Sequence, residues 1–594
     1  MPRPSSKSSM TEMLVFDKVA SSSSVTAHDD DQLTRLGKTP VLKRNFSALA
    51  LLGFSCTILQ TWEATLLLFS QGLANGGPAG IVYGFIFIWL GNLSVFSTLS
   101  ELASMAPTSG GQYHWVAVLA PPRCSKFVSY ITGWLVVGGW QGTIASALYI
   151  TASLIQAVIT LNVDDYQAPA YHATMLFWAC LAVVVFLNSF NTCLLAAFET
   201  SVLAVHITGF FAILIVLVVL SPHKTATEVF TTFNNGGGWS SQGVSLLVGL
   251  VGNVFAFVGK YQCKQCSLSY SAPAADTIGS ASSSGVDGSF HGGPQMSEET
   301  RNPAIVVPRA TILGLMINGA LGFGMILAIL FCMGDVDAVL KNKYGFPFVE
   351  VFLQSTKSVA ATSAMTGVVL LLALAGLAGL FASTSRVMWS FARDHGVPGW
   401  QTLSKVCTAF VRNLTTECNE TDKKMDQVHS STAVPLWAVA CTACVSFLLS
   451  LINLGSTIAF NSVVSLAVSC LYASYLIVSV LFLWRRCTRG FGSGLPASTA
   501  TSAALYLPST LSGSRASLTW GPWRVPGVLG VVNNAFACVY LAVVMVFAFF
   551  PPTARVDAST MNWSVLVTGA TTLFAVVYYV LWGRRLYTGP VMET

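Results

Sequence analysis

Three consecutive side chains near the start of the chain could recognise a small charged molecule. Thr61, Trp62 and Glu63 lie at the centre of an apolar segment, 48–73, that is long enough to cross a membrane. A carboxylate beside an indole ring can hold a cationic amine by charge and cation–π attraction, and it can also carry a proton. A hydrogen bond that only fixes helix packing is the alternative. Because an ionisable group inside a bilayer is costly, we favour a functional role for Glu63.

A second candidate pair lies further along, in the stretch AAFETSVLAVHITGFFAIL. Glu199 and His206 are seven residues apart there, which is two helical turns and puts both on one helix face. Histidine changes charge near neutral pH, so His206 could carry a proton. A histidine that is held only by packing is the alternative.

The apolar segment 243–304 is interrupted in its middle. It begins GVSLLVGLVGNVFAFVG and, after a polar stretch, resumes SFHGGPQMSEETRNPAIVVPRA. Helices that break inside a bilayer line a cavity or are buried in protein, and such breaks are typical of transporter substrate sites. We expect Phe255, Phe257, Gly259 and Asp287 to border a cavity, because unwound backbone would let both phenylalanines face it. Ordinary core or lipid-facing packing of the two rings is the alternative.

The composition is that of a multi-span membrane protein. Of the 594 residues, 53% are hydrophobic and 9% are charged, and the mean hydropathy is +0.64. Soluble domains carry about 25% charged residues. The net charge of +6 is spread over the loops, so it indicates membrane topology and not a nucleic-acid partner. The 14 cysteines lie mostly in apolar segments, and we expect them to be reduced.

Apolar runs of about 20 residues predict twelve membrane-spanning helices. They are 48–73, 79–105, 126–157, 171–190, 194–220, 243–304 (broken), 308–333, 359–385, 435–453, 456–484, 526–550 and 562–583. Lys and Arg gather in the loops that lie on one side if both termini are cytoplasmic, which predicts that orientation. We interpret 1–45 as a disordered cytoplasmic tail, 46–585 as the membrane domain and 586–594 as a second cytoplasmic tail.

No enzyme motif is present. The chain has no GxSxG, no P-loop and no HExxH, so we expect neither an enzyme nor an ATP-driven pump, and no cofactor. Cys263 and Cys266 form a single CxxC without a second pair of ligands, so we expect no metal site.

Several stretches together resemble the fungal amino acid/choline/GABA permeases of the amino acid–polyamine–organocation superfamily. They are TWEA, NGGPAGIVYG, SELASMAPTSGGQYHWV, MSEETRNPAIVVPRA, TSRVMWSFARDHGVPG and LINLGSTIAFNSVVSL, which follow in order over roughly 45–585. The resemblance implies an all-α membrane protein with a 5+5 inverted-repeat transporter fold and two extra helices. It also implies broken first and sixth helices and alternating access by cation-coupled symport, usually with protons.

The resemblance also implies a place for the substrate, between a first-helix break near Leu59–Ala64 and a sixth-helix break near Phe255–Gly259. His206 falls in a stretch, HITGFFA, that is similar to a fifth-helix pattern of these permeases. We therefore expect a plasma-membrane transporter whose partners are the lipid bilayer and a small molecule, with His206 in proton coupling. A non-transporting amino-acid sensor of the same fold is the alternative, which the short tails disfavour.

The sequence leaves the substrate open. Choline would favour an aromatic and acidic box such as Trp62 with Glu63. GABA or another amino acid would place its carboxylate at a free helix N-terminus.

One stretch departs from the family pattern. Residues 260–285, KYQCKQCSLSYSAPAADTIGSASSSG, are polar and unlike anything stable at membrane depth. Without them the chain would read FAFVG-VDGSFH, which is close to the family pattern. Gly-Lys-Tyr at 259–261 can be encoded by a sequence that contains a GTAAGT splice donor. We therefore hypothesise an unspliced intron, in which case a protein that retains this stretch could be inactive.

Overall fold

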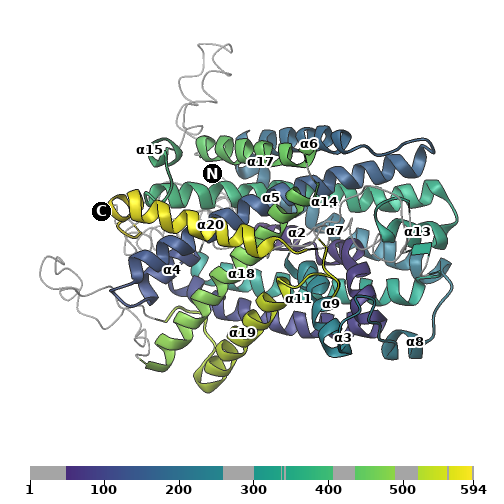
Figure 1. Cartoon of the computed structure of the whole chain (residues 1–594), viewed down its shortest axis with the longest axis horizontal. Helices are drawn as coiled ribbons and strands as arrows, with labels where there is room; N and C mark the ends of the chain where they lie inside the picture. Colours follow the sequence, from purple (N-terminus) through teal and green to yellow (C-terminus); the bar gives the residue numbers. More distant parts are fainter. Residues whose placement is uncertain are drawn as a thin grey trace, which may run out of the picture.

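The structure of the chain is a computed structural model. It describes residues 48–190, 192–258, 300, 302–335, 338–339, 343–405, 435–455, 457–488, 520–557 and 561–590. In these ranges the chain is a bundle of helices. Most of the long helices follow the long axis of the molecule, with α4, α15 and the C-terminus at one end and α8 and α13 at the other (Figure 1). We refer to these as the α4 end and the α13 end.

The bounds of the helices in chain order are as follows. They are α2 (Ala48–Leu59), α3 (Thr61–Met105), α4 (Gln112–Leu119), α5 (Ser125–Asn162), α6 (Ala170–Phe190), α7 (Thr192–Leu220), α8 (Ala226–Thr231), α9 (Gln242–Val258), α11 (Pro303–Cys332), α13 (Pro347–Thr356), α14 (Val359–Arg393), α15 (Trp400–Leu403), α17 (Leu436–Gly455), α18 (Thr457–Thr488), α19 (Gly527–Ala548), α20 (Ser564–Tyr578), the π-helix η3 (Tyr579–Gly583) and α21 (Arg584–Leu586).

Eleven helical segments in the described part of the chain are long and apolar enough to cross a membrane. They correspond to every predicted span except the sixth. The first half of the sixth is α9, which has 17 residues and ends at Val258. The prediction of an all-α membrane protein with about twelve spanning helices is confirmed, while the insertion 260–285 lies outside the described residues.

The first membrane helix is broken at a single residue. α2 ends at Leu59 and α3 begins at Thr61, and between them Gln60 has φ 44° and ψ 47°. This left-handed conformation is uncommon for a residue that is not glycine. The expected break in the first helix is therefore confirmed, and it lies inside the predicted range.

A second irregularity inside α3 separates the first span from the second. Gly77 has φ 70°, and Pro78 follows it. A Cβ atom at Gly77 would lie 2.7 Å from both the Asn234 nitrogen and the Thr232 oxygen. Positive φ and close backbone approach both require glycine here.

The broken helix lies in the interior of the bundle. α2 packs against α7, α11 and α14, and α3 packs against α9 and α11. The side chains at the break, Gln60 to Glu63, are all at most 2% exposed. Polar groups of the first helix are thus enclosed by protein, as an interrupted membrane helix requires.

Two polar clusters hold the α4 end together. Glu101 of α3 accepts hydrogen bonds from Arg486 of α18, at 2.9 Å, and from the Val525 backbone N–H, at 2.8 Å. Tyr113 of α4 donates to Asp394, at 2.8 Å. Glu101 is fully buried, so the structure gives it a packing role that joins α3, α18 and the segment before α19.

Candidate functional site

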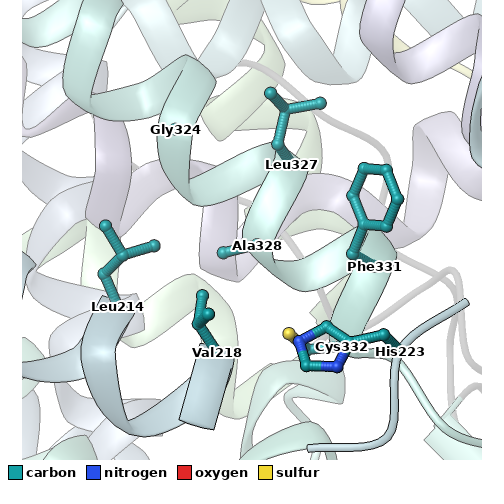
Figure 2. Close-up of a pocket in the computed structure, with 8 residues that line it drawn as sticks. All are labelled: Leu214, Val218, His223, Gly324, Leu327, Ala328, Phe331 and Cys332. Atoms are coloured by element: carbon teal, nitrogen blue, oxygen red, sulfur yellow. The ribbon is translucent and has the colours of Figure 1, made fainter. Parts of the chain in front are cut away.

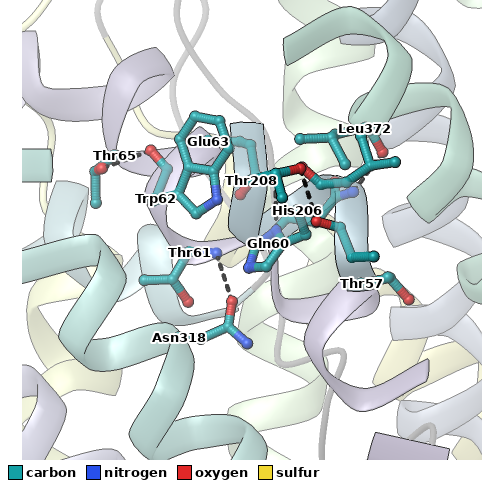
Figure 3. Close-up of polar contacts among 12 residues, drawn as sticks. Thr57, Gln60, Thr61, Trp62, Glu63, Thr65, His206, Thr208, Asn318 and Leu372 are labelled. Carbon is teal, nitrogen blue, oxygen red and sulfur yellow. Dashed lines mark hydrogen bonds and ion pairs between the residues drawn. The ribbon is translucent and has the colours of Figure 1, made fainter. Parts of the chain in front are cut away.

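The side chains that could bind a ligand or carry a proton lie close together at the break between α2 and α3. Figure 3 shows Gln60, Thr61, Trp62 and Glu63 beside His206 of α7, with Asn318 and Leu372 nearby. Asn318 belongs to α11 and Leu372 to α14. Three long helices therefore meet the first membrane helix at the point where its backbone is interrupted.

The centre of this site is a contact between Glu63 and His206. Glu63 Oε1 lies 2.8 Å from His206 Nδ1, and both side chains are 0% exposed. Glu63 stands in the first turn of α3, where the helix dipole stabilises a negative charge. The two residues singled out from the sequence thus form one buried acid–base pair.

The side chain that the described structure places against His206 comes from another helix. Glu199 was expected to share its face of α7, but the side chain of Glu199 lies outside the described residues. The described structure instead places the Glu63 carboxylate, from the first helix, against the imidazole.

Trp62 forms an aromatic wall next to the pair. Its ring centroid lies 5.9 Å from that of His206 and 6.0 Å from that of Phe210, with the latter pair edge to face. Phe210 follows His206 by one turn of α7, so one helix face presents both rings to the indole. Phe210 was missed from the sequence, although the GFFA stretch contains it.

Asn318 and Gln60 hold the broken backbone in place. The Thr61 N–H donates to Asn318 Oδ1 at 3.3 Å, and Asn318 Nδ2 donates to the Gly314 carbonyl at 3.0 Å. Gln60 Nε2 donates to the carbonyl of Leu372. A Cβ atom at Gly376 would lie 2.8 Å from the Gln60 amide, so this part of α14 must stay small.

These positioning residues were also missed from the sequence. Gln60 and Asn318 are amide side chains inside otherwise apolar spans, and that is the signal that could have identified them. Gly376 lies in the LAGLAGLF stretch, where a small residue indicates close helix packing in general.

Several polar atoms of the site have no hydrogen-bond partner in the described structure. They are Thr61 Oγ1, Trp62 Nε1, Glu63 Oε2 and His206 Nε2, and each of these side chains is fully buried. Buried polar atoms are nearly always paired in proteins, so these four are open to hydrogen bonds from a bound molecule or from water. The atoms include donors and acceptors, which suits a small molecule with charge and hydrogen-bonding capacity.

The sixth-helix residues fall only partly within the described structure. Phe255 and Phe257 lie in α9, which stays helical through Val258, so the expectation that they sit on unwound backbone is wrong. The helix continues through the apolar residues up to Val258, whereas the break was expected to begin near Phe255. Gly259 and Asp287 lie outside the described residues, and the role of all four in substrate binding stays a prediction.

A separate cavity of about 300 Å³ lies between α7 and α11, near their C-terminal ends. It is lined by Leu214, Val218, His223, Gly324, Leu327, Ala328, Phe331 and Cys332 (Figure 2). The lining contains none of the residues at the helix break, and most of it is hydrocarbon. The cavity is thus separate from the polar residues at the break.

The two cysteines of the CxxC motif, Cys263 and Cys266, lie outside the described residues. No group of three or more His, Cys, Asp or Glu side chains in them could hold a metal ion.

Known proteins are similar to the chain over most of its length. A family model described as amino acid permease matches residues 46–571. A choline transporter of Saccharomyces cerevisiae is 24% identical, over 92% of this chain and 82% of its own length. An amino-acid permease of Arabidopsis thaliana is 25% identical, over 94% and 96%, and amino-acid permease 2 of Neurospora crassa is 25% identical, over 96% and 91%.

Proposed function

Because the chain belongs to the amino acid permease family, we propose that it is a secondary active transporter of an amino acid or a small amine such as GABA or choline. The coupling ion in this proposal is the proton. The chain is an integral membrane protein, and the proposal places it in the plasma membrane with both termini in the cytoplasm.

One observation carries the proposal. The first membrane helix breaks at Gln60, directly beside a fully buried carboxylate and imidazole that are 2.8 Å apart. A break at this depth frees backbone N–H and carbonyl groups for a ligand. An acid–base pair at the same place can exchange a proton with what binds there.

Substrate recognition would use the groups that lack partners. An ammonium group would bind Glu63 Oε2 and the face of Trp62. A carboxylate would bind the backbone N–H groups in the first turn of α3 that follow Thr61, whose own N–H is held by Asn318, and the helix dipole there favours negative charge. The two modes are compatible in an amino acid such as GABA, which carries both groups.

Proton coupling would use His206. Its Nδ1 contacts Glu63 and its Nε2 has no partner in the described structure, so the ring can gain or lose a proton as the site opens to one side or the other.

The experiment is uptake of labelled choline, GABA and a panel of amino acids into permease-deficient yeast. The strain should express the full chain and, in parallel, a version that lacks 260–285. Uptake of at least one of these compounds above the empty-vector strain is the expected result. No uptake by either version, despite correct surface display, would reject transport of these compounds and favour a non-transporting sensor of the same fold.

A further inference from the structure

The pair Glu63–His206 has no neighbouring charge to balance it in the described structure. In the described structure, Glu63 and His206 pair with each other through the contact between Nδ1 and Oε1. Their outer atoms, Glu63 Oε2 and His206 Nε2, have no hydrogen-bond partner there. Cys56 on α2 is the further titratable group that interacts electrostatically with Glu63. The thiol adds no positive charge.

The other elements around the pair supply no counter-charge either. α9 has no ionisable residue between Gln242 and Val258. The remaining ionisable side chains of α3, α6, α11, α13 and α14 form no ion pair with Glu63 or His206 in the described structure. They are Tyr83, Glu101, Tyr171, His172, Cys180, Arg309, Cys332, Glu350, Arg386 and Arg393. Cys193 and Glu199 of α7 have side chains outside the described residues, and the whole of 259–299, which includes Asp287 and His291, lies outside them as well.

The contact itself fixes the number of protons that the pair can hold. At 2.8 Å, a nitrogen lone pair and a carboxylate oxygen need one proton between them. With that proton alone the pair has a charge of −1. With a second proton the pair is neutral, either as imidazolium and carboxylate or as imidazole and carboxylic acid.

Charge balance then links the proton to the substrate. A net charge buried in a low-dielectric site is strongly disfavoured unless it is paired, which favours the neutral form, with its second proton, for a buried pair without a counter-charge. An organic monocation that enters would raise the total to +1, and release of that proton restores neutrality. A zwitterion has no net charge, so it leaves the second proton in place.

We infer that the Glu63–His206 pair holds either this second proton or a monovalent organic cation, but not both. The inference rests on the proposed function and adds a rule to it. A zwitterion such as an amino acid is carried together with the proton, whereas a quaternary ammonium compound takes the place of the proton. The buried Trp62 face beside Glu63 Oε2 provides the cation–π surface that a quaternary ammonium needs.

The test measures proton release when a ligand is added to the full-length protein in lipid nanodiscs, with a pH-indicator dye in weak buffer. The probes are choline and glycine betaine, which share the trimethylammonium group and differ in net charge. Choline is expected to release about one proton for each molecule bound, with an apparent affinity that rises about tenfold per pH unit while the pair holds its second proton. Glycine betaine is expected to release none.

Variants assign the proton to the pair. Glu63→Gln should abolish the release, while Glu63→Asp should retain it at lower choline affinity and provides the readout if Glu63→Gln does not fold. Asp164→Asn removes an exposed carboxylate outside the membrane spans and should behave as the wild type. Release in Glu63→Gln equal to that of the wild type would overturn the inference.

Two further results would overturn it. One is the absence of proton release with choline, whether choline binds or not, and the other is release with glycine betaine. The proposed function is judged separately by uptake. If the same protein takes up an amino acid while choline releases no proton, the permease function stands and only this inference fails.

Discussion

Glu63 Oε1 and His206 Nδ1 lie 2.8 Å apart inside the bundle, although 143 residues separate the two side chains in the chain. Neither side chain is exposed. The contact ties α7 to the first turn after the break in the first helix. Any change in the protonation of this pair therefore acts directly on the segment that would bind a substrate.

The first prediction concerns proton coupling by His206. His206→Gln can still donate a hydrogen bond to Glu63 but cannot accept a second proton, and His206→Ala removes the contact altogether. In both variants the dependence of uptake on external pH should be largely lost between about pH 5 and 8, where histidine usually titrates. Initial uptake rates at matched surface expression provide the measurement. An unchanged pH dependence in His206→Ala would rule out the coupling role.

The second prediction concerns Asn318, which accepts a hydrogen bond from the Thr61 N–H. Asn318→Leu leaves this buried donor without its partner, which should lower the free energy of unfolding by about 1–3 kcal/mol. The apparent Tm of the purified protein in detergent measures the loss. Asn162→Leu, at an exposed position at the end of α5, is the control and should change Tm much less. Equal Tm values for the two variants would contradict the role of Asn318.

The third prediction uses two tyrosines at the α4 end that lie outside the membrane spans. Burial, reinforced by the Asp394 carboxylate, raises the pKa of the Tyr113 phenol well above its usual value. Burial also raises the pKa of Tyr587, whose hydroxyl is 2.7 Å from Ser129 Oγ. The folded protein thus binds these protons more tightly than the unfolded chain.

It follows that their contribution to stability is fully present below about pH 10, the usual pKa of tyrosine, and is lost as the pH rises towards the folded-state values. The double variant Tyr113→Phe/Tyr587→Phe should show a shallower decline of Tm above about pH 10 than the wild type. It should also start from a lower Tm at neutral pH, because it lacks the hydrogen bonds to Asp394 and Ser129. Parallel declines in the two proteins would contradict this account.

The fourth prediction concerns 260–285. If this stretch is a retained intron, a chain that lacks it should reach the cell surface and take up substrate at least as well as the full chain. Sequencing of mature transcripts should show few reads that cover the region. Reads across 260–285 in most transcripts, together with loss of uptake on deletion, would show that the stretch belongs to the working protein.

The sequence predicted the helices well because long apolar runs leave a chain in a bilayer few alternatives to helix. It also identified Glu63 and His206 one by one, since charged or titratable groups are rare inside such runs. It could not predict that they meet. Helix periodicity relates only residues on the same helix, so it could place Glu199 on the face of His206 but could not bring in Glu63 from another helix.

The supporting residues were missed for a related reason. Asn318 accepts a hydrogen bond from a backbone N–H at the break, and Gln60 donates one to a backbone carbonyl of α14. The sequence alone does not show which backbone N–H or carbonyl group will need such a side-chain partner. The expected unwinding at Phe255 and Phe257 was wrong because the glycine-containing apolar stretch before them continues as regular helix to Val258.

The most direct measurement of the central claim is uptake by Glu63→Gln compared with Asp164→Asn and the wild type, at equal surface expression. The substrate is the one identified in the yeast uptake screen. If the buried pair is the binding and coupling centre, Glu63→Gln should lose most of its transport, while Asp164→Asn should keep the wild-type rate. Wild-type transport by Glu63→Gln would contradict the assignment of the site to the break between α2 and α3.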